Sequence, residues 1–158
     1  MYDVVIIGKG PAGISAALYT KRANLSTCVI GKDLGALEKA DKIENYYGLK
    51  PIISGKELIE IGLKQAEELE IEIITDEVLN ISWENNYKIF TKRHTLEAKA
   101  VILATGASRV KPRIQGIDEF EGKGISYCAV CDAFFYRGKD VAVLGNGNYA
   151  IHEIQELL

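Results

Sequence analysis

Two cysteines and a carboxylate form the segment of this sequence that is best suited to chemistry. Cys128 and Cys131 are two residues apart, and Asp132 follows directly. Thiols at this spacing can form a disulfide, exchange electrons as a dithiol, or bind a metal. We predict a redox-active dithiol, with a metal site and a purely structural role as the alternatives.

The metal alternative needs about four ligands. Only Cys28, His94 and His152 could add to the pair, and none has the spacing of a zinc finger. We therefore expect no metal site. Cys28 lies inside an apolar run and is expected to be a small core residue, and His152 is expected to lie on the surface without a role.

Composition and charge exclude several classes of protein. The chain has 158 residues, of which 47% are hydrophobic and 26% charged, as in a globular protein with a core. Its net charge is −3 and its densest basic cluster is residues 92–94, which does not suggest a nucleic-acid partner. No apolar stretch approaches the roughly 20 residues of a membrane span. Three cysteines and no signal-like start predict a cytoplasmic protein.

A glycine-rich turn lies near the start of the chain. Residues 4–7 are a continuous apolar run, typical of a strand that is buried on both faces. The turn GKGPAG follows at 8–13 and opens a predicted helix at 11–23. In such a turn the first glycine allows a tight bend, the second lets backbone approach a pyrophosphate, and the third lets helix and strand pack closely. This context predicts a dinucleotide-binding unit.

The second predicted strand, at 27–30, ends at Gly31. An acidic residue usually stands at this strand end and accepts ribose hydroxyls, but here the nearest acid is Asp33. An ordinary NAD site is therefore less well supported. Residues 31–48 predict a long loop, of the kind that often carries ligand contacts.

The next elements predict the fold class. Ser54 and Glu57 are spaced as a capping box for a helix to about residue 68, and a third strand is expected at 70–75. Short runs then predict an antiparallel meander in place of the usual helical crossover, followed by a buried parallel strand. The predicted class is α/β, a Rossmann-like parallel sheet with an antiparallel β-meander crossover. The runs lie at 78–82, 87–91, 95–98 and 100–104.

The last third of the sequence begins a second unit of the same kind. Residues 112–124 are rich in turn residues and predict a linker, and the aromatic run 134–136 is expected in the core. A strand is expected at 140–144, followed by the turn GNGNYA at 145–150 and a terminal helix. We predict a first domain at 1–111. Residues 112–158 would hold a linker, the cysteine pair and the start of a second dinucleotide-binding domain.

Five motifs in one order carry a resemblance to a known family. They are GKGPAG at 8–13, ENYYG at 44–48, ILATGA at 102–107, CAVCD at 128–132 and GNGNYA at 145–150. Together they resemble the low-molecular-weight, flavin-dependent thioredoxin reductases. The resemblance implies FAD in the first domain and NADPH as the electron source. It also implies a thioredoxin or thioredoxin-like protein as the partner, and a homodimer.

The resemblance also implies roles for particular residues. Cys131 would be the thiol nearer the flavin, Cys128 the thiol that attacks the partner, and Asp132 the general acid or base. Other positions are implied to bind the cofactors: the FAD pyrophosphate, the flavin, the adenine through its backbone contact, the end of the sheet, and the second nucleotide. They are Gly8, Gly10, Pro11, Ala12, Gly13, Gly31, Asn45, Val78, Ala104, Thr105, Gly106, Gly145 and Gly147.

The sequence departs from the family in two places. A flavin-contacting segment of two glycines and a glutamine is here residues 33–38, and Asn146 and Tyr149 replace smaller residues in the second turn. Tyr149 could crowd a nicotinamide cofactor's phosphates. Two alternatives follow: a related flavoenzyme reduced by ferredoxin, and a non-catalytic fragment of such an enzyme. The segment that completes the flavin domain is also missing, so we expect this chain alone to bind FAD weakly and to be inactive.

Overall fold

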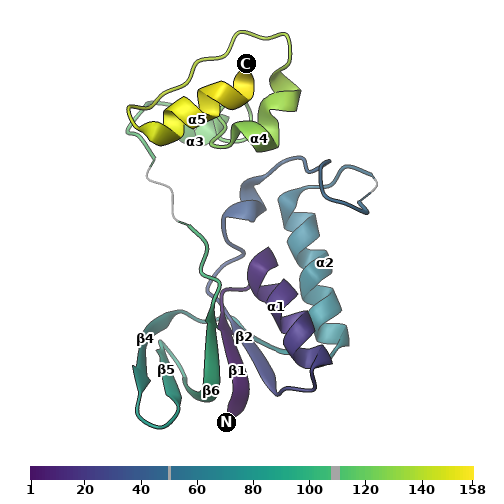
Figure 1. The fold of residues 1–158 in the computed structure, drawn as a ribbon, viewed down its shortest axis with the longest axis vertical. Coiled ribbons are helices and arrows are strands. Elements are labelled where there is room, and N and C mark those ends of the chain that lie inside the picture. The colour runs from purple at the N-terminus through teal and green to yellow at the C-terminus, as the bar shows by residue number, and fades with distance from the viewer. Residues whose placement is uncertain (50, 108–110) are drawn as a thin grey trace. The chain divides into compact units, whose positions relative to one another are not determined.

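A computed structural model describes residues 1–49, 51–107 and 111–158 of the chain. The chain forms two compact units, one of Met1–Glu44 with Gly48–Val110 and the other of Asn45–Tyr47 with Lys111–Leu158. Figure 1 shows the sheet and two long helices of the first unit, and the short helices of the second. None of the helices in the described ranges has the length and apolar character that a membrane crossing requires.

The first unit is built on a six-stranded sheet in the order β3-β2-β1-β6-β5-β4. Strands β1, β2, β3 and β6 run parallel, whereas β4, β5 and β6 form an antiparallel meander. The predicted fold class is therefore confirmed. The strands are β1 (Tyr2–Ile7), β2 (Thr27–Ile30), β3 (Glu72–Ile74), β4 (Val78–Trp83), β5 (Tyr87–Thr91) and β6 (Thr95–Leu103).

Strand β6 corrects one expectation. We predicted two strands at 95–98 and 100–104, but the structure has one continuous strand. The reason is that Ala98 pairs with Tyr2 of β1 on one side and with Tyr87 of β5 on the other. The single strand β6 therefore pairs antiparallel with β5 of the meander and parallel with β1. The strand is also less buried than expected, since Leu103 is 67% exposed.

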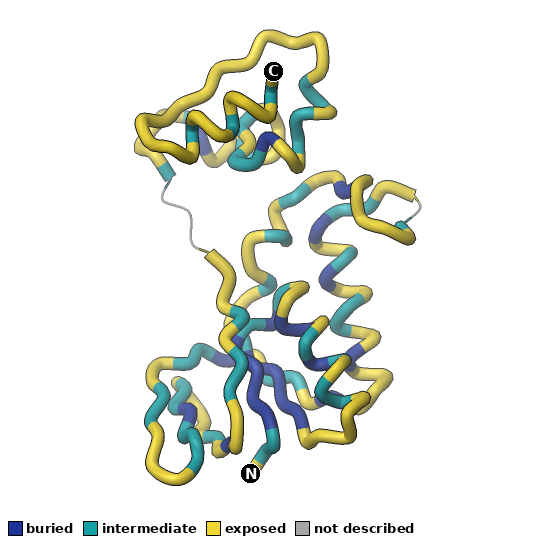
Figure 2. The backbone as a smooth tube through the Cα atoms, viewed as in Figure 1, coloured by how far each residue is buried: buried dark blue, intermediate teal, exposed yellow. Residues whose placement is uncertain are grey.

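The core lies on both faces of the sheet. Consecutive strand residues point to opposite faces, so Val4 and Ile6 of β1 face the helices, while Val5 and Ile7 face the meander. Figure 2 shows these strands as the most buried part of the unit. Cys28 is fully buried on the meander face, and its burial raises the pKa of the thiol to about 12. Its prediction as a core residue is confirmed.

Two helices cover the other face, α1 (Pro11–Arg22) and α2 (Gly55–Glu68). The predicted capping box of α2 is present: the Glu57 N–H donates to Ser54 Oγ at 3.2 Å, and the Ser54 N–H donates to Glu57 Oε2 at 2.7 Å. A Cβ at Gly55 would overlap the carbonyl of Leu37 in the 3-10 helix η1 (Ala36–Lys39). The start of α2 therefore fixes part of the long loop.

The second unit holds α3 (Ile117–Phe120), α4 (Ala129–Asp132), the 3-10 helix η2 (Ala133–Tyr136) and α5 (Asn148–Leu157). Helix α3 falls within the segment that we expected to be a linker. Lys111 forms ion pairs with Asp118 at 2.6 Å and with Glu121, and these pairs tie that segment to itself.

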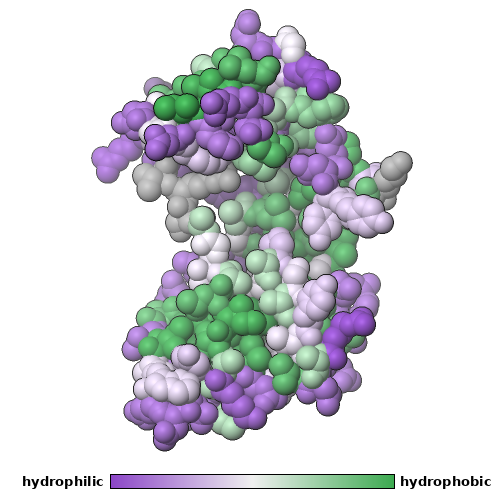
Figure 3. Space-filling view, viewed as in Figure 1, coloured by the Kyte–Doolittle hydropathy of each residue, from purple (hydrophilic) through white to green (hydrophobic). Residues whose placement is uncertain are grey.

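Two expectations for the second unit are wrong. Residues 140–144, all within the described part of the chain, form no strand, because no other described segment pairs with them. Their apolar side chains stay exposed, Val141 at 50% and Leu144 at 74%. The aromatic run 134–136 is not core either, since Phe134 is 62% exposed. Figure 3 likewise shows apolar side chains at the surface over α5.

Candidate functional site

The glycine turn after β1 is packed as a phosphate-binding turn requires. Gly8 has a φ of 118°, and a Cβ there would overlap the carbonyl oxygen of Ala104. A Cβ at Gly13 would overlap the carbonyl oxygen of Gly8. Both glycines are therefore needed for close packing, the first against β6 and the second between α1 and β1.

The middle glycine of the turn faces open space instead. A Cβ at Gly10 would come no closer than 4.0 Å to Leu34, the nearest neighbour. Gly10 is the N-cap of α1 and has no side chain to cap the helix, and Pro11 follows at its start. The N–H groups of Ala12 and Gly13 lie in this first turn, before the first helical hydrogen bond from Ile14 N–H to Gly10 O. This end of the helix fits a phosphate.

The end of β6 lies beside this turn. The Ala104 N–H donates to the carbonyl oxygen of Ile7 at 2.8 Å and so extends the pairing of β6 with β1. Thr105 and Gly106 follow and are exposed, and Gly106 has a φ of 68°. The structure thus brings Ala104 next to Gly8 at the carboxyl edge of the parallel strands, where ligands of such sheets lie.

Lys9 is a site residue that our sequence reasoning missed. It is only 9% exposed, and its Nζ donates to Thr75 Oγ1 at 2.8 Å. A Cβ at Gly31 would lie 2.9 Å from the backbone nitrogen of Lys9. The absence of the usual acid at position 31 therefore has a steric cause, because the Lys9 chain occupies that space. A lysine inside a glycine-rich turn was the available signal.

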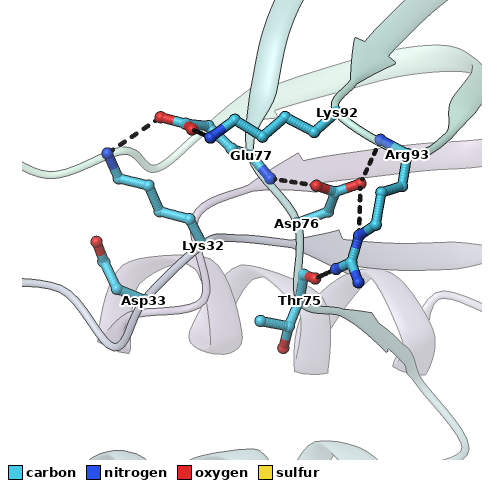
Figure 4. Close-up of a pocket in the computed structure, with 7 residues that line it drawn as sticks. All are labelled: Lys32, Asp33, Thr75, Asp76, Glu77, Lys92 and Arg93. Carbon is cyan, nitrogen blue, oxygen red and sulfur yellow. Dashed lines mark hydrogen bonds and ion pairs between the residues drawn. The ribbon is translucent and has the colours of Figure 1, made fainter.

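A charged cleft lies beyond the ends of β2 and β3 (Figure 4). Lys32 and Lys92 both pair with Glu77, at 3.3 and 2.6 Å. Val78, the residue implied to hold adenine by its backbone, follows Glu77 and pairs with Thr91 in the meander. The cleft has a volume of about 610 Å³, and its lining residues are Lys32, Asp33, Thr75, Asp76, Glu77, Lys92 and Arg93.

Asp76 organises one wall of the cleft. Its side chain is 3% exposed and accepts hydrogen bonds from the Thr91 hydroxyl at 2.7 Å and from the Arg93 N–H at 3.1 Å. The Glu77 N–H donates to the other carboxylate oxygen at 2.8 Å. These donors, Thr91 first, hold the pKa of Asp76 below its usual value. The carboxylate therefore ties the β5–β6 turn to the end of β3.

Asn45 belongs to the second unit and is exposed. Its neighbours Tyr46 and Tyr47 are exposed as well, at 56% and 101%.

In the second unit, Cys128 and Cys131 are joined by a disulfide, with their Cα atoms 5.3 Å apart. Cys128 is the N-cap of α4, and its Sγ accepts the Cys131 N–H at 3.3 Å. Cys131 is exposed, whereas Cys128 is half-buried. Within the described ranges, no three His, Cys, Asp or Glu side chains gather as metal ligands would.

Ser126 links the disulfide to Asp132 and was not predicted. Its hydroxyl accepts the Cys128 N–H at 3.1 Å and donates to the Asp132 carboxylate. The Asp132 N–H in turn donates to the carbonyl oxygen of Cys128 at 3.1 Å. The carboxylate is thus held close to the short helix α4 and its N-cap, which carry both sulfurs.

The second glycine turn repeats the design of the first. A Cβ at Gly145 would crowd the Cβ of Ala150 at 2.5 Å, while Gly147, the N-cap of α5, faces open space. Tyr149 stands in the first turn of α5, and its hydroxyl donates to the carbonyl oxygen of Tyr127 at 2.8 Å. Helix α5 is therefore tied to the segment just before Cys128.

The fold and these sites define an α/β protein with a Rossmann-like sheet that also carries a cysteine disulfide. A family model of the pyridine nucleotide-disulphide oxidoreductases matches residues 2–157. The chain belongs to that family.

Several similar proteins are thioredoxin reductases. That of Treponema pallidum is 44% identical over 155 residues, a match that covers 96% of this chain and 50% of the relative. The crystal structure of thioredoxin reductase from Streptococcus pyogenes superposes with a TM-score of 0.92 at 39% identity, covering 99% of this chain and 52% of that one. The atypical thioredoxin reductase of Desulfovibrio vulgaris is 45% identical, with a TM-score of 0.65 and coverage of 99% and 53%. This chain therefore spans about half the length of these relatives.

The carboxylate of Asp76 predicts a pH dependence of stability. A carboxyl whose pKa is lower in the folded than in the unfolded state stabilises the fold above the unfolded pKa of about 3.9 and stops doing so as the pH falls through the folded pKa. We expect Asp76→Asn to lower the melting temperature at pH 7. We also expect the melting temperature of this variant to fall less between pH 5 and pH 3 than that of the wild type, as followed by circular dichroism.

Glu84→Gln is the matched control, because Glu84 also has a lowered pKa through its pairing with Lys88, but its side chain is 70% exposed. Solvent screens such a pair, so its removal should change little. A melting profile of Asp76→Asn that is parallel to the wild type at all pH values would contradict the assigned role.

Proposed function

We propose that this chain is the FAD-binding and disulfide-bearing part of a flavin-dependent reductase of thioredoxin or a thioredoxin-like protein. The observation that carries the proposal is the Cys128–Cys131 disulfide, linked through Ser126 to the carboxylate of Asp132. The similarity to thioredoxin reductases over almost the whole chain supports it. Under this proposal the complete protein works in the cytoplasm, as a homodimer.

The first glycine turn fits the pyrophosphate of FAD. Gly10 leaves open space at the N-terminus of α1, and the helix has no acidic residue in its first turn. The backbone of Gly8, Gly10, Pro11, Ala12 and Gly13 would hold the pyrophosphate by hydrogen bonds and by the helix dipole. The remaining positions proposed to contact FAD are Gly31, Asn45, Val78, Ala104, Thr105 and Gly106.

Bound FAD would supply the two electrons that open the disulfide, and NADPH, held at Gly145 and Gly147, would be their source. The Cys128 thiolate then attacks a disulfide sulfur of the partner and forms a mixed disulfide. Cys131 attacks Cys128 Sγ, which releases the partner as a dithiol and closes the disulfide again. Asp132 moves the proton that each thiol gains or loses.

A local hydrogen bond favours Cys128 as the attacking thiol. Its sulfur accepts the Cys131 N–H, and an N–H donor stabilises a thiolate more than a neutral thiol. The segment from Ser126 to Asp132 therefore supplies both a stabilised nucleophile and a nearby proton carrier.

The exchange step can be tested without flavin. The reduced Cys131→Ser variant of the 158-residue chain, freed of reductant, should trap oxidised thioredoxin as a mixed disulfide through Cys128. Non-reducing electrophoresis and mass spectrometry would identify the bond. The matched variant Cys128→Ser should trap much less, roughly tenfold, because its remaining thiol lacks that N–H donor. Equal trapping by both variants, or the reverse pattern favoured by the greater exposure of Cys131, would contradict the assignment of the two thiols.

Gly10→Ser tests the FAD site separately from the fold. A serine at the N-cap can cap α1, so the melting temperature should not fall. Its side chain would nevertheless occupy the open space and take N–H groups meant for the phosphate. We expect FAD to bind at least tenfold more weakly, a loss of about 1.4 kcal/mol, in a titration of flavin fluorescence against the wild-type chain.

The control for this change is Gly13→Ala, whose Cβ would overlap the Gly8 carbonyl and which should lower the stability itself. Unchanged FAD affinity in a folded Gly10→Ser variant would argue against a pyrophosphate at this turn.

The electron source has a second candidate, an iron–sulfur protein such as ferredoxin. Tyr149 places a bulky side chain in the first turn of α5, where a nicotinamide cofactor's phosphates would bind, and its hydroxyl is bonded to Tyr127. Anaerobic addition of NADPH to a complete flavoprotein containing this chain separates the two. Bleaching of the flavin absorbance supports NADPH. No bleaching with NADPH, followed by bleaching with reduced ferredoxin, supports the alternative.

A further inference from the structure

A carboxylate from α5 contacts the backbone between the two cysteines. Helices α4 and α5 pack on each other in the second unit (Figure 1). Glu153 of α5 accepts a hydrogen bond from the N–H of Ala129, the residue that follows Cys128. The Glu153 side chain is 14% exposed and Ala129 is 9% exposed. The contact is therefore largely shielded from water.

The first turn of α4 divides its N–H groups between two acceptors. The Ala129 N–H goes to the Glu153 carboxylate, and the Cys131 N–H goes to Cys128 Sγ. A sulfur and a carboxylate therefore share one turn of backbone. When the disulfide is reduced, a thiolate at Cys128 would form beside a negative charge that is already fixed there.

Like charges that share a shielded site oppose each other's ionisation. A redox disulfide whose thiolate is stabilised becomes a stronger oxidant. A charge that opposes the thiolate has the reverse effect and makes the dithiol a stronger reductant. Glu153 thus acts against the Cys131 N–H donor, and the balance between them sets how readily the pair gives up electrons.

Other charged groups also surround α4. Asp132 lies on α4 itself, Arg137 follows η2, and Tyr127 and Tyr136 are nearby phenols. On α5, His152 lies 3.9 Å from both Glu153 and Glu156 and would offset their charge when protonated.

We propose that Glu153 is a positioning residue: its carboxylate fixes the first turn of α4, opposes ionisation of the Cys128 thiol and makes the Cys128–Cys131 dithiol a stronger reductant. This inference rests on the redox role proposed above for the pair.

The reduction equilibrium tests it directly. The disulfide of the 158-residue chain reacts with two glutathione thiols to give the dithiol and one glutathione disulfide, so two electrons and two protons pass to the protein. Thiol trapping and mass spectrometry measure the fractions. In Glu153→Gln, which keeps an acceptor for the Ala129 N–H but loses the charge, the equilibrium should shift three- to tenfold toward the dithiol. A tenfold shift is about 30 mV for this two-electron couple.

The rate of alkylation of Cys128 by iodoacetamide, followed against pH, is the second readout. The pH at the midpoint of this rate profile should be lower in Glu153→Gln than in the wild type. Glu156→Gln is the matched control, because it removes the same charge from the same helix. Its carboxylate lies 3.9 Å from His152 and, within the described part of the chain, it is Glu153 and not Glu156 that accepts the Ala129 N–H. Glu153→Asp keeps the charge, so its pH midpoint should stay close to that of the wild type.

Equal values for Glu153→Gln and Glu156→Gln in both measurements would overturn the proposal, as would a Glu153→Asp shift as large as that of Glu153→Gln. If circular dichroism shows that Glu153→Gln does not fold, His152→Lys decides, because it places a permanent cation beside an intact Glu153 at a position that is 60% exposed. Its midpoint should fall below that of His152→Asn, and equal midpoints would overturn the proposal.

These measurements need neither flavin nor thioredoxin. Failure of the thioredoxin-trapping experiment would therefore contradict the proposed function and leave the role of Glu153 standing. An unchanged equilibrium in Glu153→Gln would do the reverse.

Discussion

The close contact of Gly8 with the carbonyl of Ala104 is the constraint on which the first unit depends. No side chain fits between the turn after β1 and the end of β6, and the φ of 118° at Gly8 is open to glycine alone. The contact holds the N-terminus of α1 at the carboxyl edge of the sheet. Because β6 also pairs with β5, the same strand joins that edge to the meander.

Much of this unit could be predicted because its signals are local. The apolar runs of β1 and β2 and the spacing of Ser54 and Glu57 report on neighbours within a few residues. The glycine turn is also local: Gly8 and Gly13 pack closely against backbone, and Gly10 faces open space. The single strand β6 was missed because its continuity is decided by pairing on both sides of Ala98, which sequence spacing does not record.

The residues that the sequence did not reveal were missed for a different reason. Lys9 contacts Thr75, and local sequence patterns do not describe such a contact, because the two residues come from separate elements. Ser126 and Glu153 likewise act through hydrogen bonds to backbone N–H groups, which any polar side chain could make. Such roles are set by tertiary packing, so residue type and spacing alone do not reveal them.

The second unit shows how far a strand signal depends on its partners. Residues 141–144 are a continuous apolar run, as residues 4–7 of β1 are, yet they stay exposed because no described strand pairs with them. Contacts with α5, and not pairing in a sheet, therefore hold the segment around the disulfide. Tyr149 in the first turn of α5 bonds to Tyr127, and Glu153 in the second turn bonds to Ala129. It follows that the helix which begins at the second glycine turn also fixes the backbone between the two sulfurs.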